Sequence, residues 1–224
     1  VNQYKYPSLD VRPYFKRNYL YGETMTHILG YVGRINDRDV ERLKKEEKFA
    51  NYSGSTDMGK LGIERYYEEQ LHGTTGFEEV EINNRGKVIR KLREQPATAG
   101  KSIHLTIDLA LQRYIMSLLS GQKGAVVVLD PKDNSVLAMV STPSYDNNLF
   151  VDGISASDYK RLLNDPARPL YSRATQGVYP PASTVKPFVA VAALTEGVIT
   201  PHTTIFDPGY WMLPNSTKRF RDWK

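Results

Sequence analysis

The feature that most constrains the fold is a nearly pure apolar run, Ala-Val-Val-Val-Leu, between Gly124 and Asp130. A strand with this pattern is typical of a sheet that is covered on both faces. Residues 131–134 have turn chemistry, and residues 135–141 return as a second strand. The chain is therefore expected to contain a sheet with other elements packed on it.

Helical patterns surround this pair of strands. Residues 103–107 are expected to form a strand, and Asp108 can cap a helix that follows it. The apolar stripe of that helix is predicted to consist of Leu111, Tyr114, Ile115, Leu118 and Leu119. Residues 155–164 indicate a polar surface helix. Residues 184–196 are apolar on nearly all sides and end at Gly197, so this helix is expected to be central and buried. The pattern predicts an α+β fold with a sheet packed on helices.

The first part of the chain has a different organisation. Residues 37–47 indicate a polar helix capped by Asp37, and residues 62–71 indicate a second helix. Residues 77–82 and 87–92 flank Asn-Asn-Arg-Gly, which favours a β-hairpin. The small residues at 95–100 predict a boundary between one domain over residues 1–97 and a second over residues 98–224.

Charge and composition exclude several classes of function. Lys and Arg total 30 against 25 Asp and Glu, and the excess is spread along the chain, so a nucleic-acid partner is not expected. The absence of cysteine excludes disulfides and cysteine-based zinc ribbons within this chain. No apolar run approaches the ~18 residues that a membrane span needs. No signal peptide is visible, and any membrane anchor is expected to lie upstream of Val1.

Three Ser-x-x-Lys pairs occur, at Ser120/Lys123, Ser157/Lys160 and Ser183/Lys186. The bare pattern is common, so only its context can assign chemistry to it. The first pair falls at a helix end and the second on a polar stretch, and both are interpreted as structural.

The third pair opens the apolar helix. Residues three apart on a helix share a face, about 5–6 Å apart at Cβ, so Lys186 can reach Ser183. Apolar surroundings disfavour an ammonium group and make lysine a usable base for a serine nucleophile. Pro180 and Pro181 are expected to extend the entry, and the helix N-terminus favours a developing oxyanion. The alternative is a helix-capping serine beside a surface lysine.

Longer segments carry a family resemblance. Gln176-Gly-Val-Tyr-Pro-Pro-Ala-Ser183-Thr-Val-Lys186-Pro-Phe resembles the active-site segment of class B penicillin-binding proteins. Residues 62–76 resemble the signature of their non-catalytic pedestal domain, and residues 105–112 and 128–146 resemble the start of their transpeptidase domain. Residues 206–211 and 218–223 are similar to the cell-elongation subgroup of Gram-negative bacteria.

The resemblance implies a partial penicillin-binding transpeptidase fold, preceded by part of a pedestal. It implies that Ser183 is acylated by the D-Ala-D-Ala end of a peptidoglycan stem peptide, with Lys186 as its base, and that a neighbouring amine then takes the acyl group. β-Lactams would trap the same serine. The expected location is the periplasmic face of the inner membrane, and the expected partner is a membrane glycan polymerase.

The sequence departs from the family pattern in two places. The family's second motif, Ser-x-Asn or Ser-x-Asp, and its third, Lys-Thr-Gly or Lys-Ser-Gly, do not follow Ser183, so the chain is expected to hold only part of the site. Ala182 stands where relatives often carry glycine, a change from one small residue to another that is expected to matter little.

No cofactor is expected to be required. Some relatives hold a structural zinc, and Asp207 and Asp222 are candidate ligands here, although Asp207 before Pro-Gly is also typical of a turn. The four histidines, His27, His72, His104 and His202, show no ligand spacing.

Two other functions stay open. A D,D-carboxypeptidase or β-lactamase would use the same serine, although the pedestal-like residues 1–97 argue against a β-lactamase. A non-catalytic scaffold for a glycan polymerase is compatible with the same sequence.

Overall fold

A computed structural model describes residues 14–86 and 88–222 of the chain. The chain divides into two compact units, residues 1–177 and residues 178–224. None of the helices among these described residues combines the length and apolar character that crossing a bilayer requires. Along the chain, the first unit contains α1 (Gly22–Leu29), β1 (Val32–Arg34), α2 (Asp37–Lys45), η1 (Phe49–Tyr52), β2 (Asp57–Gly59), α3 (Gly62–Tyr66), α4 (Glu68–His72), β3 (Phe77–Ile82), β4 (Val88–Gln95), α5 (Leu109–Leu118), β5 (Gly124–Leu129), β6 (Val136–Thr142), η2 (Asn147–Phe150), α6 (Ala156–Asn164) and α7 (Arg173–Gln176).

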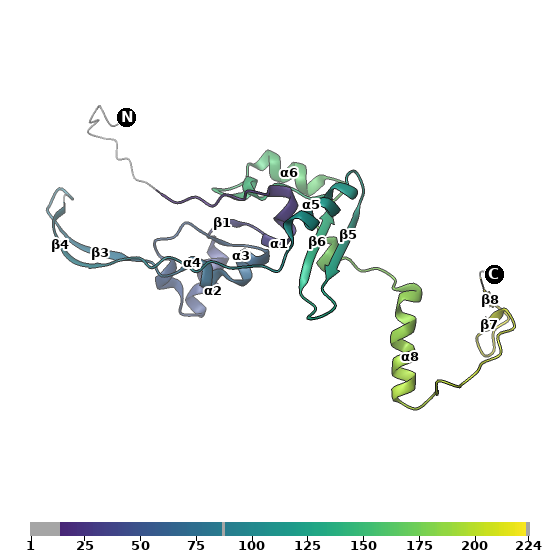
Figure 1. Ribbon diagram of the computed structural model, residues 1–224. Coiled ribbons are helices and arrows are strands. Elements are labelled where there is room, and N and C mark those ends of the chain that lie inside the picture. The colour runs from purple at the N-terminus through teal and green to yellow at the C-terminus, as the bar shows by residue number, and fades with distance from the viewer. Residues whose placement is uncertain (1–13, 87, 223–224) are drawn as a thin grey trace. The chain divides into compact units, whose positions relative to one another are not determined.

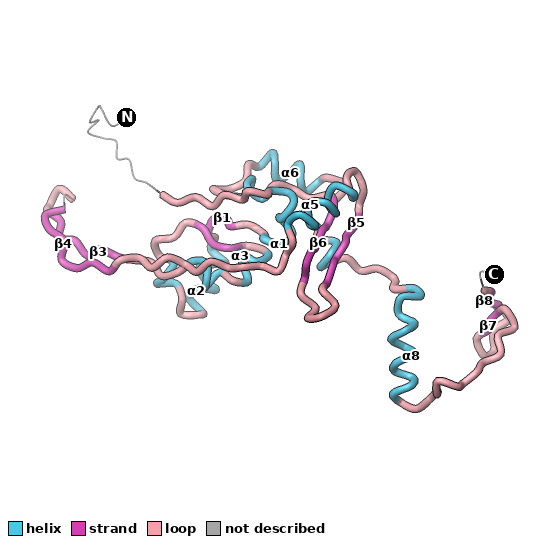
Figure 2. Tube along the Cα trace, in the orientation of Figure 1, coloured by secondary structure: helices cyan, strands magenta, loops and turns pink. Residues whose placement is uncertain are grey.

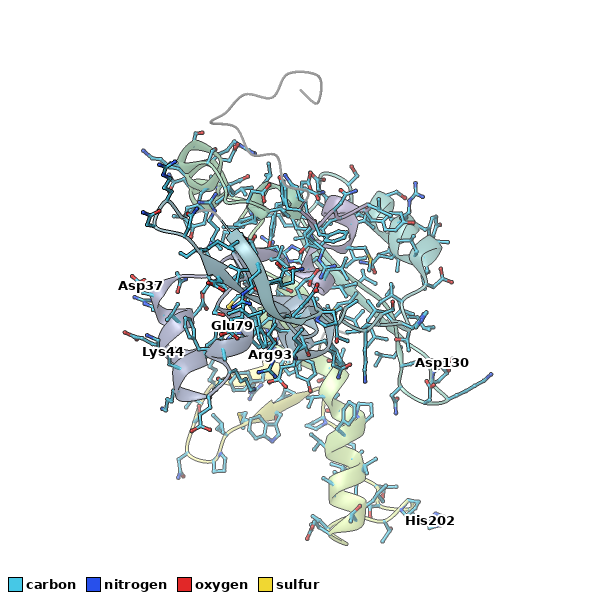
Figure 3. All side chains as sticks on the ribbon, turned by 90° about the vertical axis from the view of Figure 1, so that its left-hand side faces the viewer. Asp37, Lys44, Glu79, Arg93, Asp130 and His202 are labelled. Carbon is cyan, nitrogen blue, oxygen red and sulfur yellow. The ribbon has the colours of Figure 1, made fainter. Side chains whose placement is uncertain are left out.

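Helix α2 is confirmed, but its predicted cap is wrong. Asn36, not Asp37, is the N-cap: its side chain accepts from the Asp39 N–H at 3.1 Å, while the Asp39 carboxylate accepts from the Asn36 N–H. This reciprocal pair satisfies two backbone donors of the first turn. Asp37 and Lys44 both lie on the exposed side of α2 (Figure 3), whereas Leu43 is buried and enters a core with Tyr52 and Met58.

The single helix predicted over residues 62–71 is wrong. The segment forms two short helices, α3 and α4, which break at Tyr67, where φ is −103° and ψ is 21°. Glu68 just after the break turns back and accepts a hydrogen bond from the Gly59 N–H of β2 at 2.8 Å. This contact with β2 is a hydrogen bond between polar groups, so apolar periodicity did not reveal the break.

The predicted hairpin is confirmed by antiparallel β3 and β4, which form a two-stranded ribbon (Figure 1). Strand β4 extends to Gln95, and Lys87 lies outside the described residues. Glu79 pairs with Arg93 in the register, and both are labelled on the ribbon in Figure 3.

Helix α5 and the hairpin of β5 and β6 form the sheet-on-helix layer that the sequence predicts. The Asp108 side chain accepts from the Leu111 N–H at 3.0 Å, which confirms the cap. Ile115 of α5 packs against Ala138 and Val140 of β6, and Figure 2 shows β5 and β6 as paired strands beside the helix.

Three expectations about this layer are wrong. Residues 103–107 are not a strand, although Thr106 Oγ1 donates to Val136 O at 2.7 Å along the edge of β6. Strand β5 is not covered on both faces, because α5 covers only one and Val127 is 48% exposed. Tyr114 and Leu118 do not join the apolar stripe of α5, because the helix instead turns a polar residue, Gln112, inward.

Helix α1 ties the early part of the chain to the segment after β6. Thr26 Oγ1 donates to Tyr145 O at 2.6 Å, and Asn147 Nδ2 donates to Gly30 O at 2.7 Å. Gln112 Nε2 donates to Thr24 O at 3.0 Å from α5. Residues on both sides of position 97 therefore share one packed unit, and the boundary at 97/98 stays a prediction.

Helix α6 is confirmed as a mostly polar surface helix. Its Ser155 cap accepts from the Asp158 N–H, and Leu162 alone among its residues is buried. Leu162 joins Tyr145 and Phe150 in a further core cluster.

The second unit holds the candidate serine. It contains η3 (Ala182–Val185), α8 (Lys186–Thr195), β7 (Tyr210–Met212) and β8 (Arg219–Arg221). Strands β7 and β8 pair antiparallel, with Trp211 opposite Phe220.

Candidate active site

Ser183 lies in the 3₁₀ turn η3, which leads directly into α8. The Lys186 N–H donates to Ser183 O, which closes the turn between residues three apart. Side chains at i and i+3 eclipse in a 3₁₀ helix, so Ser183 and Lys186 lie on the same edge of the turn. Pro187 occupies the first turn of α8, where its missing N–H removes no helical hydrogen bond.

The segment before Ser183 differs from expectation. The sequence predicts an extended entry through both prolines, but Pro181 already has helical angles, φ −69° and ψ −19°. Ala182 then has φ +47°, in the left-handed region that favours glycine. An L-residue there costs roughly 1–2 kcal/mol. The expectation that alanine at position 182 matters little is therefore wrong for the backbone, because this residue is strained next to Ser183.

The expected burial of α8 is wrong. Phe188 is 75% exposed and Val191 is 62% exposed, and η3 is its main packing partner among the described residues. The apolar pattern indicates that every face of the helix packs against other residues. The described part of residues 178–224 does not provide these packing partners. Lys186 is exposed as well, so the desolvation expected to favour a neutral amine does not come from this unit.

The other two Ser-x-x-Lys pairs lie in structural contexts. Ser157 is on α6, where its hydroxyl is 3.0 Å from the Ser155 hydroxyl. Ser120 follows the end of α5, and Lys123 Nζ donates to the Pro166 carbonyl at 3.4 Å. Neither serine lies at the head of an apolar helix.

Asp207 and Asp222 lie together at the base of the β7–β8 hairpin. Asp207 Oδ1 accepts from the Gly209 N–H at 2.8 Å, and the Asp222 N–H donates to Gly209 O at 3.2 Å. The two carboxyl groups hydrogen-bond, and this contact raises the pKa of Asp222, while the charge of Lys186 opposes the shift. The structure thus brings the two candidate metal ligands into contact, within reach of the Lys186 charge.

Two carboxyl groups alone do not complete a metal site. Across residues 14–86 and 88–222, no three Asp, Glu, His or Cys side chains are grouped as a metal ion would need. His202 follows α8 and is exposed (Figure 3). A tetrahedral zinc site needs two ligands more than the two aspartates provide.

Two family models match consecutive parts of the chain. The penicillin-binding protein dimerisation domain matches residues 1–105, and the penicillin-binding protein transpeptidase domain matches residues 124–224. A peptidoglycan D,D-transpeptidase MrdA of Haemophilus influenzae is 85% identical over all 224 residues, which cover 34% of that protein. The chain therefore spans about a third of the length of this curated relative.

Solved structures show the same similarity. Penicillin-binding protein 2 of Pseudomonas aeruginosa, in complex with WCK 5153, is 45% identical with a TM-score of 0.74, over 96% of this chain and 42% of that one. Penicillin-binding protein 2 of Helicobacter pylori, in complex with MreC, is 32% identical with a TM-score of 0.80, over 93% of this chain and 38% of that one. The chain belongs to the penicillin-binding protein family, with a dimerisation domain followed by part of a transpeptidase domain.

Proposed function

We propose that this chain supplies the nucleophile of a peptidoglycan D,D-transpeptidase, with Ser183 as the acylated serine and Lys186 as its base. The observation that carries the proposal is the 3₁₀ turn at the head of α8, which sets the two side chains on one edge. Neither other Ser-x-x-Lys pair has this placement. The 85% identity to a D,D-transpeptidase MrdA supports the same assignment.

The proposed reaction combines this geometry with the D,D-transpeptidase activity named for the similar relative. Ser183 Oγ attacks the carbonyl carbon of the D-Ala-D-Ala peptide bond, and Lys186 takes the hydroxyl proton and returns it to the leaving amine. The C–N bond breaks and D-Ala leaves. An amine of a neighbouring stem then attacks the acyl carbon, the ester bond to Ser183 Oγ breaks as the crosslink forms, and Lys186 carries the amine proton to the departing serine oxygen. The Ser183 N–H, in the first turn of the helix, is a donor for the oxyanion.

Lys186 can act as a base only in its neutral form, and burial favours that form. We infer that residues covering the exposed apolar side chains of α8 supply this burial in the longer proteins of the family. Those residues would also supply the second and third motifs.

Transfer and hydrolysis can be separated in one assay. Residues 1–224 are joined to the remaining part of the H. influenzae relative, and the chimaera is given a D-Ala-D-Ala stem peptide with an amine acceptor. The proposal expects a crosslinked product by mass spectrometry, lost in Ser183→Ala and kept in Ser157→Ala. Hydrolysed peptide alone would favour a carboxypeptidase, and crosslinking by Ser183→Ala would defeat the catalytic role of this serine.

We also propose that Asp207 and Asp222 are two ligands of a structural zinc ion. The hydrogen bond with Asp207, and then the charge of Asp207, raise the pKa of Asp222, and a bound cation would relieve this contact between two carboxyl groups. Bound zinc would hold the β7–β8 hairpin in place. Zinc content measured by mass spectrometry on the purified chimaera should fall in Asp222→Asn and stay unchanged in Asp158→Asn, whose carboxylate lies on α6.

The pedestal segment is proposed to dock membrane-bound partners at the periplasmic face of the inner membrane. The H. pylori relative was solved as a complex with MreC, and a glycan polymerase is the second partner we propose. Site-specific photo-crosslinking from exposed positions of residues 14–95 in cells would test this, and crosslinks to cytoplasmic proteins alone would contradict it.

A further inference from the structure

The β3–β4 ribbon has no hydrophobic core of its own. Every residue of β4 is exposed, and no residue of β3 is buried. An isolated two-stranded hairpin is only marginally stable in water, so a surface that covers the ribbon would stabilise it. Figure 1 shows the ribbon as a long, narrow element that ends in a turn.

Charge divides the ribbon into a neutralised base and a basic tip. Residues 82–93 contain no acidic residue and five basic ones, namely Arg85, Lys87, Arg90, Lys91 and Arg93. At the base, Arg90 Nε lies 2.6 Å from a Glu81 carboxylate oxygen, and Lys91 Nζ lies 2.7 Å from one of Glu78. Arg85, in the turn, has no acidic partner among residues 14–86 and 88–222. The unpaired positive charge therefore lies at the tip.

Aliphatic side chains lie at the same tip. Ile82 and Val88 are opposite each other in the strand register and are 58% and 54% exposed. Ile89 falls at the register shift between Val88 and Arg90, so no residue of β3 pairs with it, and its side chain is 60% exposed. Exposed apolar side chains that lie together among polar residues mark a site of interaction with a protein or a membrane.

The turn at the tip satisfies its own backbone donors. The Arg85 N–H donates to Asn83 Oδ1 at 2.9 Å, and the Gly86 N–H donates to Asn83 O at 3.0 Å. A backbone donor loses its water partners when it enters an apolar medium, so it must be paired within the protein. The turn can therefore leave bulk water with these two groups already paired.

We propose that residues 82–90 insert into the surface of a bilayer that carries anionic lipid headgroups. Lipid phosphates pair with the basic side chains, and the upper part of the acyl chains covers Ile82, Val88 and Ile89. Glu81 is the acidic residue of β3 nearest to the tip, and about 10 Å of strand separates it from the turn. Interfacial segments enter a bilayer by about 5–10 Å, so the tip can insert before a carboxylate reaches the headgroups.

The shape of the tip favours a bilayer over an acidic protein surface. A protein surface could match the positive charge, but a convex turn with aliphatic side chains between the charges requires a medium that yields around it and is both anionic and apolar. The boundary between headgroups and acyl chains has these properties. The proposal does not depend on acylation of Ser183.

A fluorescent label at the tip provides a local test, because the chain contains no cysteine. Asn84→Cys, at an exposed position of the turn, is labelled with the environment-sensitive fluorophore NBD in the full chain. The control is the same label at Ser157→Cys, an exposed position of α6. Vesicles of phosphatidylethanolamine with phosphatidylglycerol should shift the emission at position 84 to the blue, and vesicles of phosphatidylcholine should not. Position 157 should respond to neither.

Two matched pairs of variants separate charge from apolar contact, with vesicle affinity measured by the label at position 84. Arg85→Gln should weaken binding about fivefold, the effect of one basic residue near an anionic surface, whereas Arg113→Gln, at an exposed position of α5, should not. Ile89→Asn should weaken binding about tenfold through lost apolar burial. Leu118→Asn, whose native side chain is 58% exposed on α5, should leave binding unchanged.

Several results would overturn the proposal. An unchanged spectrum at position 84 with anionic vesicles would remove the membrane contact, and equal shifts at positions 84 and 157 would indicate general adsorption. Equal losses of affinity in Arg85→Gln and Arg113→Gln, or in Ile89→Asn and Leu118→Asn, would refute the role of the tip. A label at position 84 that ignores vesicles, while a photo-crosslinker there captures a protein in cells, would identify a protein as the occupant. If a variant fails to fold by circular dichroism, the comparison of the two lipid compositions still decides.

Discussion

Replacing Gln112 by methionine should destabilise the first unit by roughly 3 kcal/mol, although the two side chains have similar volumes. Gln112 is 1% exposed. Its Nε2 donates to Thr24 O at 3.0 Å and to Met139 O at 2.9 Å, and its Oε1 accepts from the Met139 N–H at 2.8 Å. The side chain thus occupies the place of a neighbouring strand at the edge of β6 and joins that edge to α1.

The magnitude follows from these three hydrogen bonds. Each contributes about 1 kcal/mol net, so the loss of all three costs roughly 3 kcal/mol. The desolvation penalty of the backbone groups left without a partner adds to this loss, and the apolar burial of the methionine side chain offsets that addition. With a urea m-value of about 2 kcal/mol/M, the unfolding midpoint should fall by about 1.5 M.

The assay is urea unfolding followed by far-UV circular dichroism, with Gln122→Met as the control. Gln122 is exposed after the end of α5, so the same change there should alter stability by less than about 0.5 kcal/mol. Both tryptophans, Trp211 and Trp223, belong to the second unit, so their fluorescence reports whether that unit is affected. A Gln112→Met midpoint equal to that of Gln122→Met would refute the role of Gln112 at the strand edge.

Three further predictions follow from the structure. Burial raises the pKa of Glu64 above its ordinary value of 4.5, so stability from this group is complete below that value and is lost as pH rises through the raised pKa. Glu64→Gln should flatten the Tm profile over the pH range above 4.5 in which this carboxyl group titrates, and an unchanged slope would contradict the raised pKa of Glu64. Gly30→Ala should cost at least about 3 kcal/mol in thermal denaturation, because its Cβ would lie 1.9 Å from a backbone carbonyl oxygen at φ +72°. Gly121→Ala, with φ +73° and no atom within 4 Å, should cost only about 1 kcal/mol, and equal losses would refute the steric argument. Ala182→Gly should relieve the φ of +47° and slow hydrogen exchange at the Thr184 N–H, which donates to the carbonyl of position 181; faster exchange would contradict the strain.

Several features of the fold that depend on adjacent residues were predictable from the sequence, although the cap of α2 is Asn36 and not the predicted Asp37. The Asn-Asn-Arg-Gly turn between β3 and β4 and the Asp108 cap of α5 are both local, and both were found. Features that depend on hydrogen bonds to residues of another helix or strand were not predictable. The break at Tyr67 and the inward position of Gln112 are fixed by hydrogen bonds to β2 and β6. Apolar periodicity cannot report such contacts.

The same division applies to the candidate site. The spacing of Ser183 and Lys186 predicted a shared face, because both lie in one turn. The positive φ of Ala182 was missed, because the exchange of one small residue for another hides a backbone constraint. The apolar pattern of α8 shows that the helix needs cover, but it does not identify the residues that provide it.

The identity of the nucleophile is tested most directly by intact-protein mass spectrometry after incubation with a labelled penicillin. The protein is the chimaera of residues 1–224 with the remaining part of the H. influenzae relative. We expect one adduct per chain, mapped by proteolysis to Ser183, absent in Ser183→Ala and retained in Ser120→Ala and Ser157→Ala. An adduct of full yield on Ser183→Ala, or one mapped to another serine, would contradict the assignment of Ser183.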